Sequence, residues 1–247
     1  MLNYEVDAAL LAPRIPHGVE LDEWNGRILV SMVGFMFLDV KVLGLPIPFH
    51  RNFEEVNLRF YVRRKGPEGW RRGVVFVKEI VPRAAIAWVA DNLYQEPYVT
   101  MPMRHRIESH ENGTSRVEYE WTSGKSPCVL WKCGRERLRN HLWVEAAGGF
   151  RDMNEGEEAE FVTEHYWGYT RHRNGDTWEY QVEHPRWRVA DVRNSGFECD
   201  VNSIYGPEFS DYLSGPPASS LLAEGSPVTV YQGNRIHTER KIRDRHD

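Results

Sequence analysis

The sequence predicts a β-rich (α+β) fold with only a few short helices, and three observations support this prediction. Phe, Trp and Tyr make up 12% of the 247 residues, and aromatic side chains are favoured in strands. Prolines recur between short apolar runs, which is typical of a domain built from many short strands. Finally, residues 55–63 alternate strictly between apolar and polar side chains, and period-two alternation indicates a strand.

The two faces of the strand predicted over residues 55–63 differ sharply in chemistry. The apolar face is too continuous to meet water, so we expect it to face a hydrophobic core. The polar face presents a carboxylate, an amide, a guanidinium and a phenol at alternate positions. The apolar face comprises Val56, Leu58, Phe60 and Val62, and the polar face comprises Glu55, Asn57, Arg59 and Tyr61.

Other segments predict further strands and a few helices. Residues 27–33 and 73–81 are continuous apolar runs, which suit strands that are buried on both faces. The Asn174-Gly175 pair predicts a hairpin between residues 166–173 and 176–183, because Asn-Gly readily adopts a type I′ turn. Short helices are expected at residues 82–91, 157–165 and 217–223, with a frayed tail from about residue 236.

Length and composition indicate one domain that covers residues 1–247. A chain of this size can bury a large core without disulfides, and its three cysteines are too few for a disulfide framework. The first residues carry acid where a secretory signal needs base, and no apolar run approaches the length of a membrane span. We therefore expect a cytoplasmic protein without membrane contact.

Charge and motifs exclude several classes of function. The net charge is −5 and the basic residues are spread along the chain, which argues against a nucleic-acid partner. The ten histidines form no metal-ligand pattern, so we predict no metal, and a histidine such as His165 is expected to be a buried structural residue. No dinucleotide fingerprint, phosphate loop or nucleophile elbow is present, and no cofactor is expected.

The polar face of residues 55–63 allows two interpretations. It could be a solvated edge with cross-strand ion pairs, or it could line the interior of a closed barrel. In the second case Arg59 would bind a small anion with two parallel hydrogen bonds, and Glu55 would act as a general base.

Several motifs resemble the YqjF-like family of uncharacterised bacterial proteins, within the acetoacetate-decarboxylase-like superfamily. The most specific are Glu-x-Asn-x-Arg-x-Tyr-Val at residues 55–62 and Leu-Ala-Glu-Gly-Ser-Pro-Val at residues 222–228. The resemblance covers roughly residues 10–235. Further matching segments are residues 16–26, 33–35, 44–46, 161–166 and 183–185.

This resemblance implies a cone-shaped antiparallel β-barrel whose interior holds the site. It therefore favours the interior position for the polar face of residues 55–63. It does not supply the decarboxylase chemistry, because in the corresponding stretch, residues 94–99, Tyr98 and Val99 stand where that family has its paired lysines. Without an amine whose pKa is lowered, no Schiff base can form at that place.

Three hypotheses for function follow. In the first, the barrel binds a small carboxylate- or carbonyl-bearing molecule. In the second, a lysine-independent lyase or hydrolase uses Glu55 as general base while Arg59 or Tyr98 polarises a carbonyl. In the third, the protein is a non-catalytic interaction partner. The first hypothesis assigns the ligand contacts to Asn57, Arg59, Tyr61, Tyr94 and Tyr98, and the third rests on a surface patch of Trp70, Trp88, Trp131 and Trp143.

Overall fold

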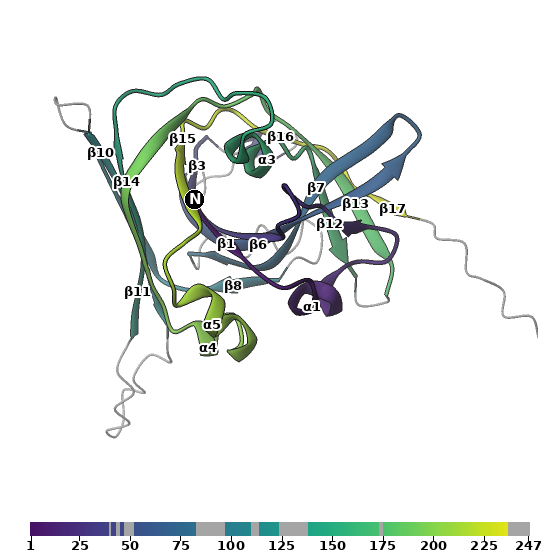
Figure 1. The fold of residues 1–247 in the computed structure, drawn as a ribbon, viewed down its shortest axis with the longest axis horizontal. Coiled ribbons are helices and arrows are strands. Elements are labelled where there is room, and N and C mark those ends of the chain that lie inside the picture. Colours follow the sequence, from purple (N-terminus) through teal and green to yellow (C-terminus); the bar gives the residue numbers. More distant parts are fainter. Residues whose placement is uncertain are drawn as a thin grey trace, which may run out of the picture.

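A computed structural model shows a β-rich protein dominated by one large sheet (Figure 1). Residues 1–39, 41–42, 45–46, 52–82, 97–109, 114–123, 138–172 and 175–236 are described. The expected helix at 82–91, Tyr94, Trp88, Trp131 and the tail beyond residue 236 lie outside these ranges. None of the helices in the described ranges is long and apolar enough to cross a membrane.

Fifteen strands hydrogen-bond into the large sheet, and a separate pair is formed by β4 and β5. The main path runs β16-β13-β12-β7-β6-β3-β1-β15-β14-β11-β10-β9. The strands are β1 (Leu2–Glu5), β2 (Glu20–Leu21), β3 (Leu29–Phe37), β4 (Lys41–Val42), β5 (Leu45–Pro46), β6 (Phe53–Gly66), β7 (Gly69–Val81), β8 (Tyr98–Thr100), β9 (Met103–Ser109), β10 (Thr114–Ser123), β11 (Leu138–Ala147), β12 (Trp167–Arg171), β13 (Thr177–Glu183), β14 (Val189–Glu198), β15 (Ser219–Ala223), β16 (Thr229–Val230) and β17 (Asn234–Ile236).

The helices are short. They are α1 (Ala8–Leu11), α3 (Glu158–Thr163), α4 (Val201–Ile204) and α5 (Ser210–Leu213), with 3-10 turns at Ala12–Arg14 and Pro207–Phe209. The expected β-rich fold with few helices is therefore confirmed. Most strand pairs are antiparallel, but β7 pairs in parallel with both β8 and β12.

Strand β6 is the centre of the sheet and pairs with β3 on one side and β7 on the other. Its apolar face is fully buried: Val56, Leu58, Phe60 and Val62 are each 0% exposed. Burying side chains of this size contributes roughly 1.5–3 kcal/mol each. The register with β7 shifts between Leu58 and Arg59, and such a bulge bends the strand locally.

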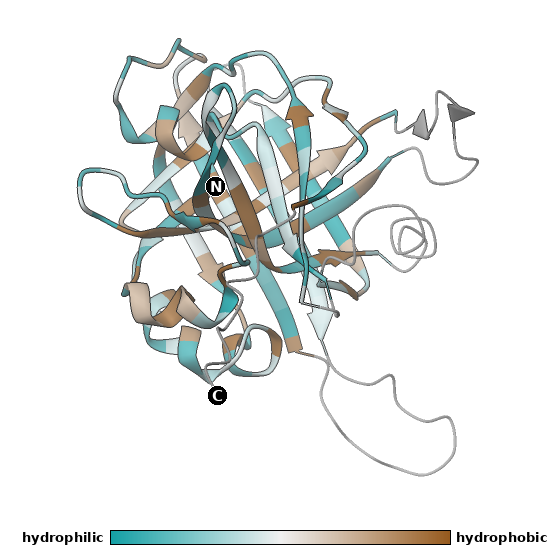
Figure 2. Ribbon diagram, turned by 90° about the vertical axis from the view of Figure 1, so that its right-hand side faces the viewer, coloured by the Kyte–Doolittle hydropathy of each residue, from teal (hydrophilic) through white to brown (hydrophobic). Residues whose placement is uncertain are grey.

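The two sides of the central sheet pack against different elements. The side that carries the apolar face of β6 forms the main core with β10, β11, α1, α4 and α5. The opposite side packs against α3, and we call it the inner side. In Figure 1 the sheet bends around α3, and Figure 2 shows hydrophobic and hydrophilic residues alternating along its strands.

The predicted hairpin is confirmed, although Asn174 itself lies outside the described residues. Strands β12 and β13 pair antiparallel, and Gly175 has a φ of +87°. A Cβ atom at Gly168 would lie 2.0 Å from the Tyr180 ring, so this position has no room for a side chain. Tyr180 therefore packs directly on the backbone of β12.

The helix expected at residues 217–223 is wrong, because Ser219–Ala223 forms strand β15. It pairs with β1 and β14 and buries Leu221. These long-range pairings override the local sequence preference. The helix expected at residues 157–165 is confirmed as α3.

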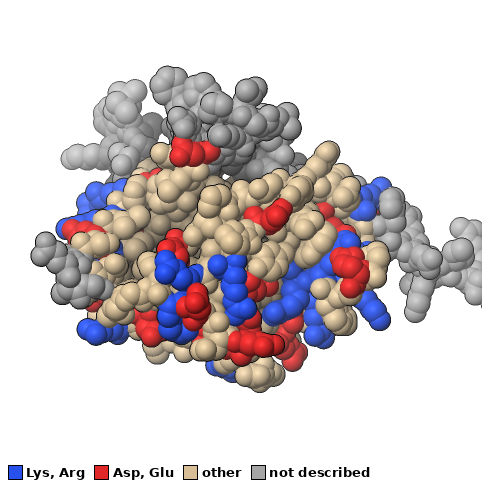
Figure 3. Space-filling model, turned by 90° about the horizontal axis from the view of Figure 1, so that it is seen from above, with Lys and Arg blue, Asp and Glu red and all other residues tan. Residues whose placement is uncertain are grey.

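The basic clusters beside the β6–β7 turn are neutralised by ion pairs. Arg72 pairs with Asp22, and both Arg64 and Arg71 reach Glu179. On the face shown in Figure 3, acidic and basic side chains are intermingled. Trp70 is exposed at the end of β7, whereas Trp143 is half-buried with Arg116 stacked on its ring.

Candidate functional site

The polar face of β6 lies on the inner side of the sheet, and most of it is buried. Glu55, Asn57 and Tyr61 are 2%, 1% and 1% exposed, and Arg59 is half-buried. The solvated-edge interpretation is therefore wrong for these residues. We call Glu55, Asn57, Arg59 and Tyr61, together with Ser31, Asn3 and Glu79 from neighbouring strands, the polar wall.

One end of the polar wall holds helix α3. Arg59 Nη2 donates to the Val162 carbonyl oxygen at 2.9 Å, and the Tyr61 hydroxyl approaches the same oxygen at 3.4 Å. The last carbonyls of a helix have no partner within the helix and carry partial negative charge. A guanidinium at this point satisfies the carbonyl and stabilises the helix end.

A chain of hydrogen bonds continues from Tyr61 along the inner side. Ser31 bonds to the Tyr61 hydroxyl and donates to Asn3 Oδ1 at 2.6 Å. Asn3 Nδ2 then donates to Ser219 Oγ at 2.8 Å, and Ser219 bonds to Glu158 in the first turn of α3. This chain fixes Tyr61 as a structural member of the wall, because its hydroxyl is already engaged.

The other end of the wall is acidic. Glu79 on β7 lies opposite Asn57 in the register and is 2% exposed. Asn57 Nδ2 donates to Glu55 Oε1 at 2.8 Å, and a side-chain hydrogen bond joins Glu55 to Glu79. Two carboxyl groups can form a hydrogen bond only when one of them carries a proton. A hydrogen bond between Glu55 and Glu79 therefore requires a proton on one of the two carboxyl groups.

Burial raises the pKa of Glu55 to about 7, against the lowering effects of Asn57, Glu79 and Arg59. The dominant cause is desolvation, because an ionised carboxylate with no water around it is unfavourable. A carboxyl group with this pKa can accept and release a proton near neutral pH.

Among the wall atoms that are buried without a hydrogen-bond partner in the described ranges, two belong to strand β6. They are Asn57 Oδ1, which is an acceptor, and Arg59 Nε, which is a donor. Leaving a buried polar group unsatisfied costs about 1–3 kcal/mol, and such groups in native proteins call for a partner. Arg59 also forms no ion pair within the described ranges.

Beyond the acidic end, the inner side becomes apolar again. Tyr98 on β8 lies beside Glu79 in the parallel register and is half-buried. It packs with Phe37 against Phe53 and Val81. The structure thus brings Tyr98 to the same end of the wall as Glu55, whereas Tyr94 lies outside the described residues.

His165 is buried beneath Tyr61, as expected for a structural histidine. Its ring packs against those of Tyr61 and Phe161, with centroids 4.7 and 5.3 Å away. Its Nε2 lies 3.6 Å from Asp22 Oδ2. Burial lowers the pKa of His165 to about 4, so the ring is neutral at pH 7.

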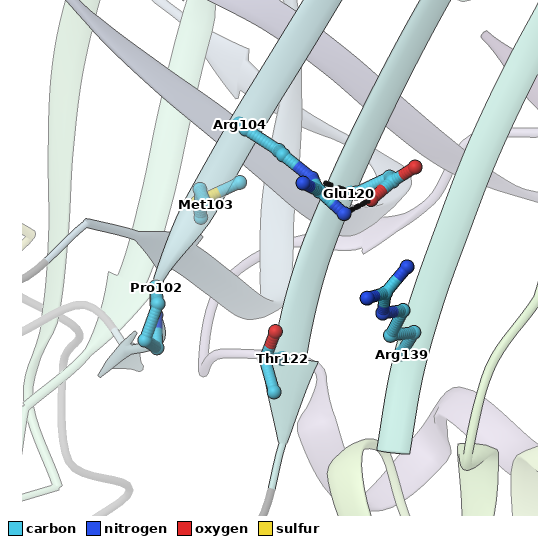
Figure 4. A pocket seen from close by; sticks show the side chains of 6 residues that line it. All are labelled: Pro102, Met103, Arg104, Glu120, Thr122 and Arg139. Atoms are coloured by element: carbon cyan, nitrogen blue, oxygen red, sulfur yellow. Dashed lines mark hydrogen bonds and ion pairs between the residues drawn. The ribbon is translucent and has the colours of Figure 1, made fainter. Parts of the chain in front are cut away.

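Two hollows lie away from the acidic end of the wall. One of about 410 Å³ lies on the sheet formed by β9, β10 and β11, where Arg104 pairs with Glu120 beside Arg139 (Figure 4). The other, of about 200 Å³, lies between α3 and β14–β15 and includes Glu158 and Ser219. The second hollow therefore adjoins the hydrogen-bond chain that leads to Tyr61 and Arg59.

The two lysines whose side chains the structure describes lie away from the polar wall. Lys78 is on the opposite side of the sheet, where its ammonium donates to the Ile204 carbonyl, and Lys65 is exposed. No group of three His, Cys, Asp or Glu side chains in these ranges could hold a metal ion.

Sequence reasoning missed Glu79, Ser31 and Asn3 as members of the wall. Glu79 and Ser31 each interrupt a run that the sequence predicts to be buried on both faces. A carboxylate or hydroxyl in such a run must find a polar partner, and this signal was available. Asn3 carried no comparable signal, because its place in the wall depends on long-range pairing of β1 with β3 and β15.

The fold of this chain is similar to that of acetoacetate decarboxylase and of an acetoacetate decarboxylase-like enzyme, and the likeness shows the class of fold. Solved structures of this class cover 95–96% of the chain at 12% identity. They are the enduracididine biosynthesis enzyme MppR complexed with pyruvate (TM-score 0.57, 86% of that chain), an acetoacetate decarboxylase-like enzyme from Sphingomonas wittichii RW1 (0.57, 89%) and acetoacetate decarboxylase from Legionella pneumophila (0.53, 83%).

Within this fold class, the chain belongs to the DUF2071 family of uncharacterized conserved proteins, which it matches over residues 1–227. It is also similar to the uncharacterized protein YqjF of Bacillus subtilis (strain 168). The two are 26% identical over 209 residues, which is 82% of this chain and 75% of that protein. The expected YqjF-like resemblance is therefore confirmed.

Proposed function

We propose that the inner side of the sheet binds a small molecule that carries a carboxylate or carbonyl group, and that Arg59 is its main anchor. The observation that carries this proposal is the buried Arg59 Nε, which has no acceptor in the described ranges. One guanidinium nitrogen of Arg59 already holds α3, so the remaining N–H groups are fixed in position. A carboxylate matches such a planar, pre-oriented donor set.

The neighbouring structures support the class of ligand without assigning it. One of them is complexed with pyruvate, a small carboxylate that also carries a carbonyl. Arg59 and Glu55 lie four residues apart on the same face of β6, which corresponds to about 13 Å between their Cα atoms. Asn57 stands between these two ends.

We further propose that the site acts without a Schiff-base lysine. The Lys78 ammonium faces away from the wall, and Tyr98 and Val99 stand where the resemblance places the paired lysines. An imine to a ligand carbonyl requires an uncharged amine next to that carbonyl.

A thermal-shift series tests the binding site. 4-Oxopentanoate carries both a carboxylate and a ketone, and a ligand that binds only the native state raises its unfolding temperature. We expect a shift with 4-oxopentanoate and a much smaller one with pentan-2-one, which lacks the carboxylate. Arg59→Lys keeps a donor for the Val162 carbonyl but loses the Nε–H group, so this variant should lose most of the shift.

Arg63→Lys is the matched control, because Arg63 lies on the same strand but pairs with Glu20 near the surface. Its shift should equal that of the unmodified protein. An unchanged shift in Arg59→Lys would remove Arg59 from the site.

A second candidate function is favoured by the pKa of Glu55, which burial raises to about 7. The Glu55 carboxylate would take a proton from the carbon beside the ligand carbonyl. The C–H electron pair then forms the carbon–carbon double bond of an enolate, while the carbonyl electrons move to oxygen, towards Arg59 or Tyr98. Return of a proton from Glu55 restores the ketone.

Proton exchange measured by NMR in D2O tests this activity. Loss of the C3 proton signal of 4-oxopentanoate should be about 10²–10⁴-fold faster with the protein than without it. Glu55→Gln should abolish the acceleration while it keeps the thermal shift. If the exchange rates with the unmodified protein and with Glu55→Gln both equal the rate in buffer, Glu55 does not act as a base towards this class of ligand.

A further inference from the structure

The acidic end of the polar wall presents mainly hydrogen-bond acceptors. Glu55 and Glu79 come from adjacent strands, each is 2% exposed, and a hydrogen bond joins them. Asn57 is 1% exposed and its amide nitrogen donates to Glu55 Oε1. Its oxygen is left buried without a donor in the part of the chain that the structure describes.

Among the described residues, the side chains around this acidic end come from β3, β6, β7 and β8. Arg59 lies four residues from Glu55 on the same face of β6, and its guanidinium turns towards α3. Strand β8 contributes Tyr98 beside Glu79, and β3 contributes Phe35 opposite Glu55. Lys78, the neighbour of Glu79, lies on the other side of the sheet.

Two buried carboxyl groups beside an unsatisfied amide oxygen are complementary to a positively charged N–H group. An ammonium group has three donors and no acceptor. It can bond to both carboxyl groups and to Asn57 Oδ1, and its charge replaces the proton that the carboxyl pair shares. Charge-assisted hydrogen bonds of this kind are stronger than neutral ones.

We infer that the site takes a small zwitterion, with its carboxylate on Arg59 and its ammonium group on Glu55, Glu79 and Asn57. This inference rests on the proposed function and narrows its ligand to amino acids that carry the amine at the far end of the chain. The strand spacing between Arg59 and Glu55 suits a ligand of about four to six carbons.

Isothermal titration calorimetry with 5-aminopentanoate and pentanoate tests the inference. The two acids share a chain length and a carboxylate and differ in the amine. We expect 5-aminopentanoate to bind at least about tenfold more tightly, since each hydrogen bond to a charged group contributes about 1.5–3 kcal/mol. Binding of the amine should also release a proton, which appears as a difference in heat between buffers of different ionisation enthalpy.

Glu79→Gln is the decisive variant, because the amide keeps the shape of the side chain and removes one carboxyl group. It should reduce the preference for 5-aminopentanoate to about twofold or less, while pentanoate binds as before. Glu55→Gln serves as the second variant, with the same expectation, should Glu79→Gln fail to fold.

The outcomes separate the inference from the proposed function. Equal affinity for both acids in the unmodified protein, or an unchanged preference in both variants, would overturn the zwitterion while Arg59-dependent binding of pentanoate stands. If neither acid binds, the proposed function fails and the inference fails with it.

Discussion

The fold disfavours the charged form of Glu55. This side chain is buried, and desolvation raises its pKa from 4.5 to about 7. Between these two pH values the folded protein retains a proton that the unfolded chain has lost. Stability contributed by this group is therefore present at low pH and is lost as the pH rises from 4.5 through 7.

We expect Glu55→Gln to remove this loss. Relative to the unmodified protein, the variant should gain roughly 2–3 kcal/mol of stability between pH 4.5 and pH 8, because one pKa unit corresponds to about 1.4 kcal/mol. Urea unfolding at a series of pH values measures this gain in stability. Glu20→Gln, at an exposed position, is the control, and identical pH profiles for the unmodified protein and Glu55→Gln would contradict the buried, protonated carboxyl.

His165 has the opposite pH dependence. Burial lowers its pKa from 6.5 to about 4, so the unfolded chain takes up a proton that the folded protein excludes. Stability contributed by neutral His165 is lost as the pH falls from 6.5 towards 4. The variant His165→Phe keeps an aromatic ring beside Tyr61 and Phe161. In urea unfolding it should lose less stability between pH 6.5 and pH 4 than the unmodified protein does. An equal loss of stability would mean that His165 is not the group responsible.

At the scale of elements, close packing of the β12–β13 hairpin depends on Gly168. A Cβ atom there would lie 2.0 Å from the Tyr180 ring, whereas one at Gly149 would meet nothing within 4 Å. We expect Gly168→Ala to destabilise the protein by about 1–3 kcal/mol, the usual cost of overpacking. The urea midpoint should fall for Gly168→Ala and stay almost unchanged for Gly149→Ala; equal midpoints would contradict the contact.

The sequence predicts an element when the residues of that element carry the signal themselves, and fails when the element depends on pairing with distant strands. Strand β6 was predictable because alternation is a local signal, and α3 because its pattern is local too. Strand β15 was not, because Ser219–Ala223 becomes a strand only through pairing with β1 and β14. The same limit applies to the site: Glu55, Asn57 and Arg59 share one strand, whereas Glu79 joins them only through the β6–β7 register.

On the scale of the whole molecule, the inner side of the sheet combines a structural end with an unsatisfied end. Near α3, Tyr61, Ser31 and Asn3 are engaged in a continuous hydrogen-bond chain. Further along β6, Arg59 and Asn57 retain polar atoms without partners in the described ranges. Unsatisfied buried donors and acceptors of this kind call for a partner, and a bound ligand would supply one.

The most direct test is an experimental structure of the protein crystallised with saturating 4-oxopentanoate. The proposed site requires density for the acid on the inner side of the sheet, with its carboxylate within hydrogen-bonding distance of Arg59 Nε. Protein side chains filling the space between Arg59 and Glu55, with the acid absent or bound elsewhere, would contradict it.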